Sequence, residues 1–498
     1  MPNHPDQPSR LSLANLVTVR AGTSVFAYDK ARLQSGIAHI GLGAFARAHI
    51  CDYTDAILNE DFGPWGIAGI NLRNPDQRDR LAPQDWLYTA INRDADVDTA
   101  KIIGAITQVH AANDDAHAIA ALLASPEIRI VSLTVTEKGY CHDPAGGRLS
   151  EHHPDIQHDL NHPRAPKSVI GVLTSALARR RDEGSHPFTV LCCDNLPHNG
   201  ALVAQLVQDF AALRNDKLAR WIETNVAFPS TMVDRIVPAT TPRDLVDAVD
   251  AIGLTDAAPV IHEPFKQWVI EDRFVDGKRP AWQRAGATLV ADVAPFEAMK
   301  LRLLNASHSA LAYLGYLGGH ETIGDCVSDP TYRAYVEALW REEIIPVTPA
   351  PPATDLHAYA RQLLARYDNP SIRHRVWQIA MDGSQKLPQR LLATTRLCLA
   401  RNLPIVRLAY AIAAWMIYVG GVDERGQLID VRDPLADTFR RALANTGPSS
   451  DARVAALIGI DAVFGPDLGA NAVFRAAVAE AYDRLRRHGA RQCVATLA

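Results

Sequence analysis

The stretch GIAHIGLGAFARAH, residues 36–49, decides the fold that we expect for this chain. Residues 36–40 have the apolar pattern of a buried strand, and a glycine turn leads from them directly into a helical pattern. Gly41, Gly43 and Ala46 match the spacing G-x-G-x-x-A, which provides a tight turn, close approach of the backbone to a pyrophosphate, and close helix–strand packing. The stretch therefore predicts the start of a dinucleotide-binding domain, with phosphate at the N-terminus of the helix.

The residues that follow continue the alternation of strand and helix. Apolar, β-rich runs cover residues 65–72, 101–109, 128–136 and 188–193, and an alanine-rich helical pattern covers residues 116–124. This alternation is typical of a doubly wound parallel sheet, which binds its ligands at the carboxyl ends of the strands. We therefore expect an α/β fold with a Rossmann-like N-terminal domain.

A charged segment follows the strand predicted at residues 65–72. Asp76 lies roughly where a carboxylate of such a domain contacts the adenosine ribose, and Arg73 lies close to it. A carboxylate at this place favours NAD, whereas a cation suits the additional phosphate of NADP. We expect Asp76 to bind the ribose and NAD to be the cofactor, and Arg73 leaves NADP open as the alternative.

Strand patterns nearly vanish beyond the segment that contains Gly277, Pro280 and Gly286, and the rest of the chain is helical in its periodicity. We therefore expect two domains. A Rossmann-like domain covers residues 1–285, and a mainly α-helical domain covers residues 286–498.

The segment VAPFEAMKLRLLNASHSALAYLGYLGG, residues 293–319, introduces polar residues into an apolar helix. At about 100° per residue, the polar residues that share one side of this helix are Glu297, Lys300, Asn305 and His308. A lysine beside such groups, partly withdrawn from water, can exchange a proton near neutral pH. Taken alone, the pattern also fits a surface ion pair and satisfied polar residues.

The composition is that of a globular protein, because 47% of the 498 residues are hydrophobic and 21% are charged. A net charge of −5 with mixed signs argues against nucleic acid as a partner. Seven cysteines without a CxxC pair, and a start without an apolar signal segment, predict a cytoplasmic protein. The longest apolar run, residues 408–422, is shorter than the roughly 20 residues of a membrane span, so we expect a buried helix and no membrane partner.

Four histidines gather in one polar stretch, namely His152, His153, His158 and His162. Their spacing matches no common zinc pattern. We expect a loop with solvated histidines and no metal site.

Several motifs along the chain resemble the mannitol dehydrogenase family, the polyol-specific long-chain dehydrogenases and reductases. Besides the glycine turn, the matching stretches are VTEKGY (135–140), CDNLPHNG (193–200), FPSTMVDRIVPA (228–239), EPFKQWVIEDRF (263–274), PFEAMKLRLLNASHSALAYLGYLGG (295–319) and NPSIRHRVWQIAMDGSQKLPQR (369–390). The resemblance covers essentially the whole chain from residue 36. It implies metal-independent hydride transfer between a nicotinamide and a secondary alcohol carbon, with the active site in the cleft between the two domains.

The resemblance also implies roles for the catalytic residues. Lys300 is the acid-base group, and Asn195 acts with Asn305 to stabilise the developing alkoxide, as an oxyanion hole does. His308 orients the reacting hydroxyl, and Glu297 passes the proton of Lys300 to water. Without the resemblance, Asp194 and Asn195 equally fit a turn or helix cap. The alternative function is a protein that only senses the cofactor, and such a protein would not need an acid-base lysine.

Further residues are assigned to the cofactor and the substrate. Glu137 belongs to the cofactor site, because TEKGY follows the carboxyl end of its strand. Asp234 matches a substrate-contacting aspartate of the family, although Asp234 and Arg235 alone would predict a structural ion pair. Lys386 matches a family lysine that reaches substrate hydroxyls.

The substrate that we expect is a sugar acid. Several of these motifs resemble more closely the fructuronate reductase branch, also called mannonate oxidoreductase, and a hexuronate needs cations for its carboxylate. The cations that could provide this are Lys138, Arg373, Arg375 and Lys386. The turn LPHNG, residues 196–200, is closer to the mannitol branch, so mannitol 2-dehydrogenase or another polyol dehydrogenase is the alternative. We expect a monomer.

Overall fold

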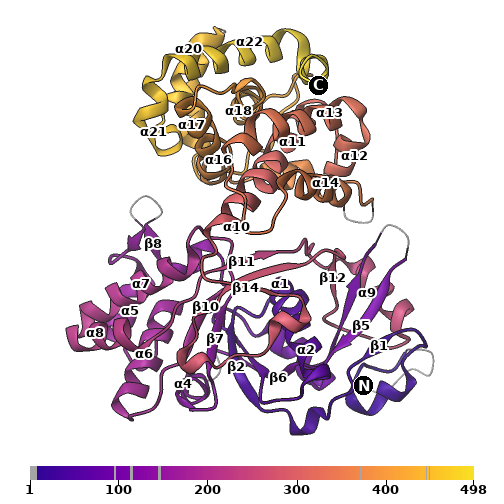
Figure 1. Ribbon diagram of the computed structural model, residues 1–498, viewed down its shortest axis with the longest axis vertical. Helices are drawn as coiled ribbons and strands as arrows, with labels where there is room; N and C mark the ends of the chain where they lie inside the picture. The colour runs from indigo at the N-terminus through magenta and orange to yellow at the C-terminus, as the bar shows by residue number, and fades with distance from the viewer. Residues whose placement is uncertain are drawn as a thin grey trace. The chain divides into compact units, whose positions relative to one another are not determined.

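The computed structural model describes residues 8–94, 97–112, 116–143, 147–370, 373–444, 446–447 and 449–498. Internal contacts divide the chain into two units, Met1–Ala294 and Pro295–Ala498. The first unit combines strands with helices, and the second is built of helices (Figure 1). The predicted fold class, an α/β Rossmann-like part followed by a mainly helical part, is confirmed.

A parallel sheet forms the centre of the first unit. Within the described residues, its five strands have the order β10-β7-β2-β3-β6. Their bounds are β2 Ser35–Ile40, β3 Gly66–Asn71, β6 Ile106–Ala111, β7 Ile130–Leu133 and β10 Thr189–Cys192. The chain builds outward from β2 first in one direction and then in the other. The carboxyl end of β2 is therefore the topological switch point, where open α/β sheets bind their ligands.

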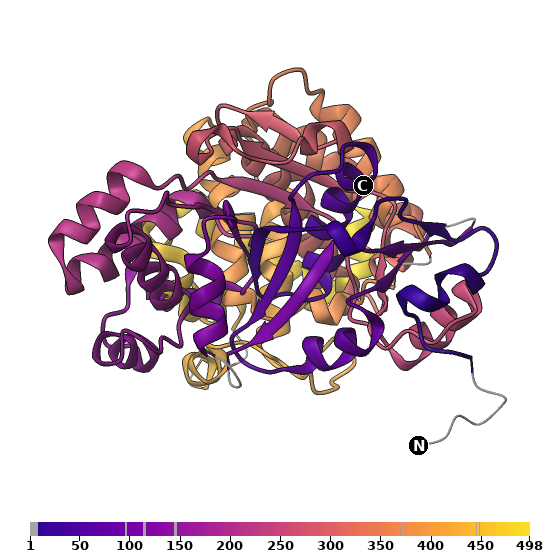
Figure 2. The same ribbon diagram turned by 90° about the horizontal axis from the view of Figure 1, so that it is seen from below.

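The two faces of this sheet are covered by different elements. On one face, Ala38 and Ile40 of β2 join a core with helices from residues 116–222, and on the other Ile37 packs with the N-terminal helices and aromatic residues of a second sheet. Figure 2 shows the magenta helices on one side of the strands and the N-terminal segment on the other. The helices of this unit are α1 Ala44–Ala48, α2 Ile50–Glu60, α3 Asp76–Leu81, α4 Ala116–Ala124, α5 Pro154–Asn161, α6 Val169–Asp182, α7 Asn199–Arg214, α8 Asp216–Asn225 and α9 Pro242–Ile252.

Smaller sheets complete the first unit. Among the described residues, their strand orders are β1-β5-β4-β12, β11-β13-β14 and β8-β9. The strands are β1 Ser24–Val25, β4 Tyr88–Asn92, β5 Thr99–Ile103, β8 His142–Asp143, β9 Arg148–Leu149, β11 Thr231–Asp234, β12 Val260–His262, β13 Gln267–Glu271 and β14 Thr288–Val290. The predicted run at residues 101–109 is thus two strands in different sheets. Gly104 allows the crossing, because a Cβ there would lie 2.7 Å from the Phe26 ring.

The second unit is organised around two buried helices, α11 Ala306–Leu317 and α18 Val406–Val419, which pack against each other. Figure 1 shows them between α16 and α17 on one side and α12, α13 and α14 on the other. The predicted buried helix in residues 408–422 is confirmed by α18. The remaining helices are α10 Ala294–Met299, α12 Ile323–Ser328, α13 Pro330–Ala338, α14 Leu356–Tyr367, α15 Val376–Ala380, α16 Gly383–Leu387, α17 Ala393–Ala400, α19 Ala436–Leu443, α20 Ser450–Ile458, α21 Asp461–Ala470 and α22 Ala472–Ala495.

Three segments of the described second unit are π-helical, namely η7 Lys300–Asn305, η8 Leu339–Ile344 and η10 Pro388–Leu392. Two sequence expectations change as a result. The helix that carries Lys300 is not a continuous α-helix. Residues 378–390, whose polar, glycine-containing sequence predicts a loop that interrupts the helical region, are largely helical. Pro388 is accommodated because the helix widens at the residue that lacks an N–H donor.

The histidine-rich stretch also differs from expectation. It forms α5 instead of a loop, because Pro154 occupies the first helical position and His153 caps the helix by accepting from the Asp155 amide. Among the described residues, no helix has both the length and the apolar character that crossing a membrane would require.

Candidate active site

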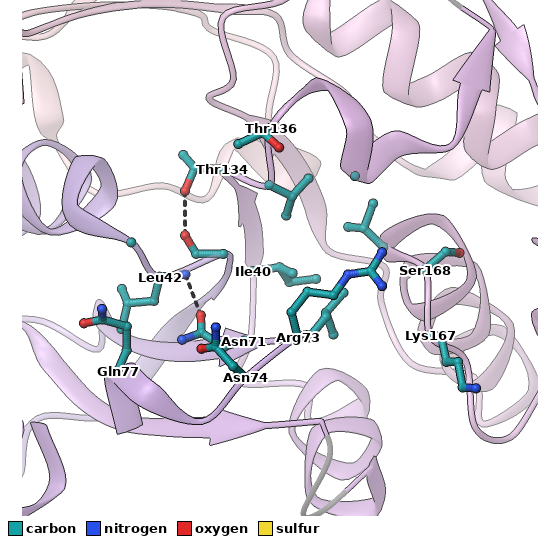
Figure 3. Close-up of a pocket in the computed structure, with 16 residues that line it drawn as sticks. Ile40, Leu42, Asn71, Arg73, Asn74, Gln77, Thr134, Thr136, Lys167 and Ser168 are labelled. Atoms are coloured by element: carbon teal, nitrogen blue, oxygen red, sulfur yellow. Dashed lines mark hydrogen bonds between the residues drawn. The ribbon is translucent and has the colours of Figure 1, made fainter. Parts of the chain in front are cut away.

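The predicted glycine turn connects β2 to α1. Gly41 has a φ of +92°, and a Cβ there would lie 2.2 Å from the Thr134 carbonyl oxygen. The turn is fixed by two hydrogen bonds: the Thr134 hydroxyl donates to the Gly41 carbonyl at 2.8 Å, and the Leu42 amide donates to Asn71 Oδ1 at 2.9 Å (Figure 3). Ala46 is fully buried. Only glycine fits at position 41, for the reasons that the motif predicts.

A cavity of about 320 Å³ opens beside this turn. Its lining comes from the carboxyl ends of β2, β3 and β7 and from the start of α6, as Figure 3 shows. At Gly43, a Cβ would meet only the Gly41 oxygen, at 3.8 Å, so the backbone faces open space. A bare backbone at the switch point of a parallel sheet suits the pyrophosphate of a dinucleotide.

The lining of the cavity differs in part from the predicted cofactor residues. Arg73, Asn74 and Gln77 line it, and Figure 3 shows Arg73 extending from the end of β3 toward Ser168. Asp76 is exposed in the first turn of α3 and is not part of the lining. Asn74 and Gln77 are thus better placed than Asp76 to contact a ribose in this cavity.

Asp194 shapes the segment that follows β7, a role that goes beyond the turn or cap predicted for it. Its carboxylate accepts from the amides of Val135 at 2.8 Å and Thr136 at 3.0 Å, and from the Tyr140 hydroxyl at 2.6 Å. Burial raises the pKa of Asp194, and these hydrogen bonds oppose the rise. Thr136 is held at a φ of +67°, which is strained for a β-branched residue, and it lines the cavity.

The predicted residues near this segment lie at different depths. Glu137 is half-buried and Lys138 is exposed in the 3₁₀ turn Glu137–Tyr140. Asn195 is exposed shortly after β10, whereas Asp234 is buried at the end of β11. The alternative prediction of an Asp234–Arg235 ion pair is wrong, because Arg235 pairs with Asp52 at 3.1 Å.

In the second unit, one helical segment carries the predicted catalytic residues. Lys300, Asn305 and His308 are all buried, and Glu297 is half-buried in the preceding α10. The π turn shifts the later residues, since one extra residue per turn moves Asn305 and His308 to about 40° and −20° from Lys300, instead of about 140° and 80°. By this geometry, Asn305 and His308 lie closer to the direction of Lys300 than they would on a regular α-helix.

Two buried polar atoms in this segment have no hydrogen-bond partner within the described structure: Asn305 Nδ2 and His308 Nε2. The His308 ring lies 4.6 Å from the His374 ring, measured between centroids. Burial, followed by nearby cations, lowers the pKa of His308, so its imidazole is neutral at pH 7. An amide donor and a neutral imidazole left unsatisfied in one place are suited to binding the oxygen atoms of a ligand.

Cationic side chains surround this place. The groups that lower the pKa of His308 are Arg390, Arg366, Lys386 and His374, and burial lowers the pKa of His374 to about 4, so that only the first three are cations at pH 7. Lys386 donates to the carbonyls of Ile379 at 3.2 Å and Met381 at 2.6 Å, and burial lowers its pKa to about 8. Arg390 was not predicted as a site residue. Its position four residues after Lys386 would have indicated it, had this segment been recognised as a helix.

The other predicted carboxylate-binding arginines lie at the surface. Arg373 and Arg375 are exposed, and Arg373 pairs with Glu321 at 3.4 Å. Within the described chain, one group has the spacing of metal ligands, formed by Cys141, His153 and Asp155. Asp155 is already paired with Arg73 at 3.0 Å, and His153 caps α5.

Comparisons with known proteins identify the family. The model of the mannitol dehydrogenase Rossmann domain matches residues 35–284, and that of the mannitol dehydrogenase C-terminal domain matches residues 292–486. The chain is 49% identical to D-mannonate oxidoreductase of Escherichia coli over 94% of its own length and 97% of that protein. It is 38% identical to mannitol 2-dehydrogenase of Aspergillus terreus, over 97% and 98% of the two chains.

A solved structure gives the same result. The ternary complex of Pseudomonas fluorescens mannitol 2-dehydrogenase with NAD and D-mannitol matches with a TM-score of 0.89 and 40% identity, over 98% of this chain and 99% of that one. The Rossmann domain at the switch point of β2 is the NAD(H)-binding part of such an enzyme. The chain therefore belongs to the mannitol dehydrogenase family, and it is an oxidoreductase that acts on CH–OH groups.

Proposed function

We propose that this enzyme is a fructuronate reductase, which interconverts D-fructuronate and D-mannonate with NAD(H) and without a metal. The observation that carries the proposal is the set of cations around His308, because a sugar acid brings a carboxylate that these charges would stabilise. The similarity to D-mannonate oxidoreductase of Escherichia coli supports it. A neutral polyol would gain nothing from several half-buried cations.

Lys300 is the proposed acid-base group of the reaction. Its buried position limits the access of water, and its ammonium form donates a proton to the carbonyl oxygen during reduction. In the opposite direction, the neutral amine accepts the proton of the hydroxyl. Glu297 is proposed to exchange this proton with water. When bound, NADH would supply the hydride for reduction, and NAD⁺ would accept it in oxidation.

Asn305 and His308 are proposed to hold the reacting oxygen. Asn305 Nδ2 donates to the oxygen as negative charge develops, as in an oxyanion hole, and His308 Nε2 orients the hydroxyl. Asn195 is proposed to assist Asn305. Asp234 and Lys386 are proposed contacts of the other substrate hydroxyls. Arg373 and Lys138, the carboxylate contacts expected from the sequence, are exposed and are less suited to that role.

The proposed cofactor site is the cavity beside the Gly41 turn. Gly41, Gly43 and Ala46 form its pyrophosphate-binding turn, while Asp76 and Glu137 remain proposed contacts from the sequence. The NAD in the solved Pseudomonas fluorescens complex supports NAD as the cofactor. Arg73, which lines the cavity, would tolerate the additional phosphate of NADP.

The test is the initial rate of NADH oxidation by the purified enzyme with D-fructuronate and, separately, with D-fructose, in the presence of EDTA. We expect kcat/KM to favour fructuronate by at least a hundredfold, about 2.7 kcal/mol. Repeating the assay with NADPH measures the cofactor preference. Loss of activity with EDTA would contradict the metal-independent mechanism.

Mannitol 2-dehydrogenase is the second candidate. The turn LPHNG and the similarity to the mannitol 2-dehydrogenases of Aspergillus terreus and Pseudomonas fluorescens favour it. A higher kcat/KM with fructose than with fructuronate would establish this activity instead.

We also propose a monomer in the cytoplasm. All seven cysteines are free, which fits a reducing compartment. Sedimentation of the purified enzyme measures the oligomeric state.

A further inference from the structure

The side chain of Arg390 is unusual among the cations of the second unit. It projects from η10 toward α11, where Nη1 donates to Ser309 Oγ at 3.2 Å. Its Nε is buried and makes no hydrogen bond in the described structure. None of the described carboxylates forms an ion pair with it. Burial lowers the pKa of Arg390, with the Tyr313 and Tyr367 phenols acting in the opposite direction.

A guanidinium that is withdrawn from water and has no counter-ion lowers the stability of the folded protein. A charge withdrawn from water without a partner destabilises the fold, and an arginine carries five N–H donors that need acceptors. The groups that surround the same place are the basic residues His308, His374, Lys386 and Arg366 and the neutral phenols, with the carboxylates of Asp382 and Asp433 acting on Lys386. Neither carboxylate forms an ion pair with Arg390 in the described structure, so a ligand anion would fit there as its counter-ion.

The geometry of the guanidinium specifies the kind of anion. Nη1 is used by Ser309, which leaves the edge formed by Nε and Nη2 without protein partners in the described structure. These two N–H groups point in parallel and match the two oxygens of a carboxylate. A lysine at this position would present a single point charge without this fork.

The other cations are less suitable for this role. The Lys386 ammonium is already held by two backbone carbonyls, and Arg373 pairs with Glu321 while 69% of its side chain is exposed. Lys138 is exposed as well. We propose that Arg390 is the specificity-determining residue of this enzyme, binding the substrate carboxylate through its Nε–Nη2 edge. This inference rests on the proposed function as a sugar-acid reductase.

The test compares Arg390→Gln and Arg390→Lys with the wild type, using fructuronate and fructose as alternative substrates of NADH oxidation. We expect Arg390→Gln to lower kcat/KM for fructuronate at least a hundredfold, mainly through KM, and to change kcat/KM for fructose less than fivefold. Arg390→Lys should recover part of the fructuronate activity, because it restores the charge without the fork. Arg440→Gln is the matched control, since Arg440 is 76% exposed and pairs with Asp437.

Each outcome has a distinct meaning. A wild-type enzyme that does not prefer fructuronate refutes the proposed function, irrespective of the variants. A wild type that prefers fructuronate, combined with an unchanged preference in Arg390→Gln, overturns the role of Arg390. Loss of the preference in Arg373→Gln alone would assign the carboxylate to Arg373. Thermal melting and NADH titration of each variant verify the fold, and Arg390→Lys provides the decisive comparison if Arg390→Gln does not fold.

Discussion

The two glycines of the turn after β2 should respond to alanine in opposite ways. In Gly41→Ala, the residue keeps a positive φ, which costs about 1–2 kcal/mol for a non-glycine residue. The new methyl group would also lie 2.2 Å from the Thr134 oxygen, so the strand end must move. Such overpacking adds about 1–3 kcal/mol. At about 2–4 °C per kcal/mol for a domain of this size, a total of about 3 kcal/mol lowers Tm by about 6–12 °C.

In Gly43→Ala, the same methyl group has room. Gly43 has a φ of −100°, which alanine adopts freely, and the nearest atom to a Cβ lies at 3.8 Å. We expect the free energy of unfolding to change by less than about 0.5 kcal/mol. The methyl group would, however, occupy the space of the pyrophosphate. If it costs about 1–3 kcal/mol of overpacking in the complex, NADH binds about 5- to 150-fold more weakly.

Two measurements separate these effects: thermal melting of the variants without cofactor, and titration of their NADH affinity by fluorescence. Gly41→Ala should lose stability, and Gly43→Ala should keep its Tm and lose affinity. A Gly43→Ala variant that binds NADH as tightly as the wild type would refute the assignment of this turn to the pyrophosphate. An unchanged Tm in Gly41→Ala would refute the steric argument.

Four further predictions concern the remaining site residues. Lys300→Met should lose nearly all turnover at neutral pH while NADH affinity stays within twofold, and Asn305→Ala should lower kcat on the order of 100-fold. Single-turnover kinetics and NADH titration check both variants. An Asn305→Ala effect confined to KM would contradict the role of Asn305. Asp194→Asn replaces an acceptor of two backbone amides by a group with one oxygen and should cost about 1–3 kcal/mol of stability; denaturant unfolding measures the loss, and an unchanged midpoint would contradict it. Burial lowers the pKa of His374 to about 4, below its ordinary value of 6.5, so the unfolded chain binds the proton first and the stability of the fold falls as pH decreases from about 6.5 to 4. His374→Gln should remove up to about 3 kcal/mol of this decline. Parallel Tm–pH curves for the variant and the wild type would refute the reasoning.

The glycine turn could be predicted from the sequence because its requirements are local. The positive φ of Gly41 and the short loop follow from a few adjacent residues. The division of residues 101–109 between two sheets could not, because it depends on the close approach of Gly104 to Phe26, far away in the sequence. Sequence patterns describe a strand and its burial, but the sheet that receives it is decided by distant packing.

The helical structure of residues 378–390 could not be predicted from the sequence, for a related reason. Glycine and proline usually end helices, so Gly383 and Pro388 predict a loop here. In the structure, α16 is supported from outside, because the Asp433 carboxylate accepts from the Ser384 amide at 2.7 Å and the Ser384 hydroxyl at 2.6 Å. This cap by Asp433, which is distant in the sequence, compensates for the low helix propensity of the segment. Since Arg390 continues this helical run, the same contact explains why its role was not recognised.

The π turn at Lys300–Asn305 connects the fold of the second unit to its chemistry. A π-helical turn has no stability advantage over an α-helical one, and such turns occur mostly as single turns, often at functional sites. Here it packs against η8 and η10, so the wider turn is held by its neighbours. Without the extra residue, Asn305 and His308 would rotate away from Lys300 by about 100°. The stability given up in the backbone is thus accounted for by the closer grouping of a lysine, an amide and an imidazole, which a regular α-helix of the same sequence would spread over a wider arc of the same side.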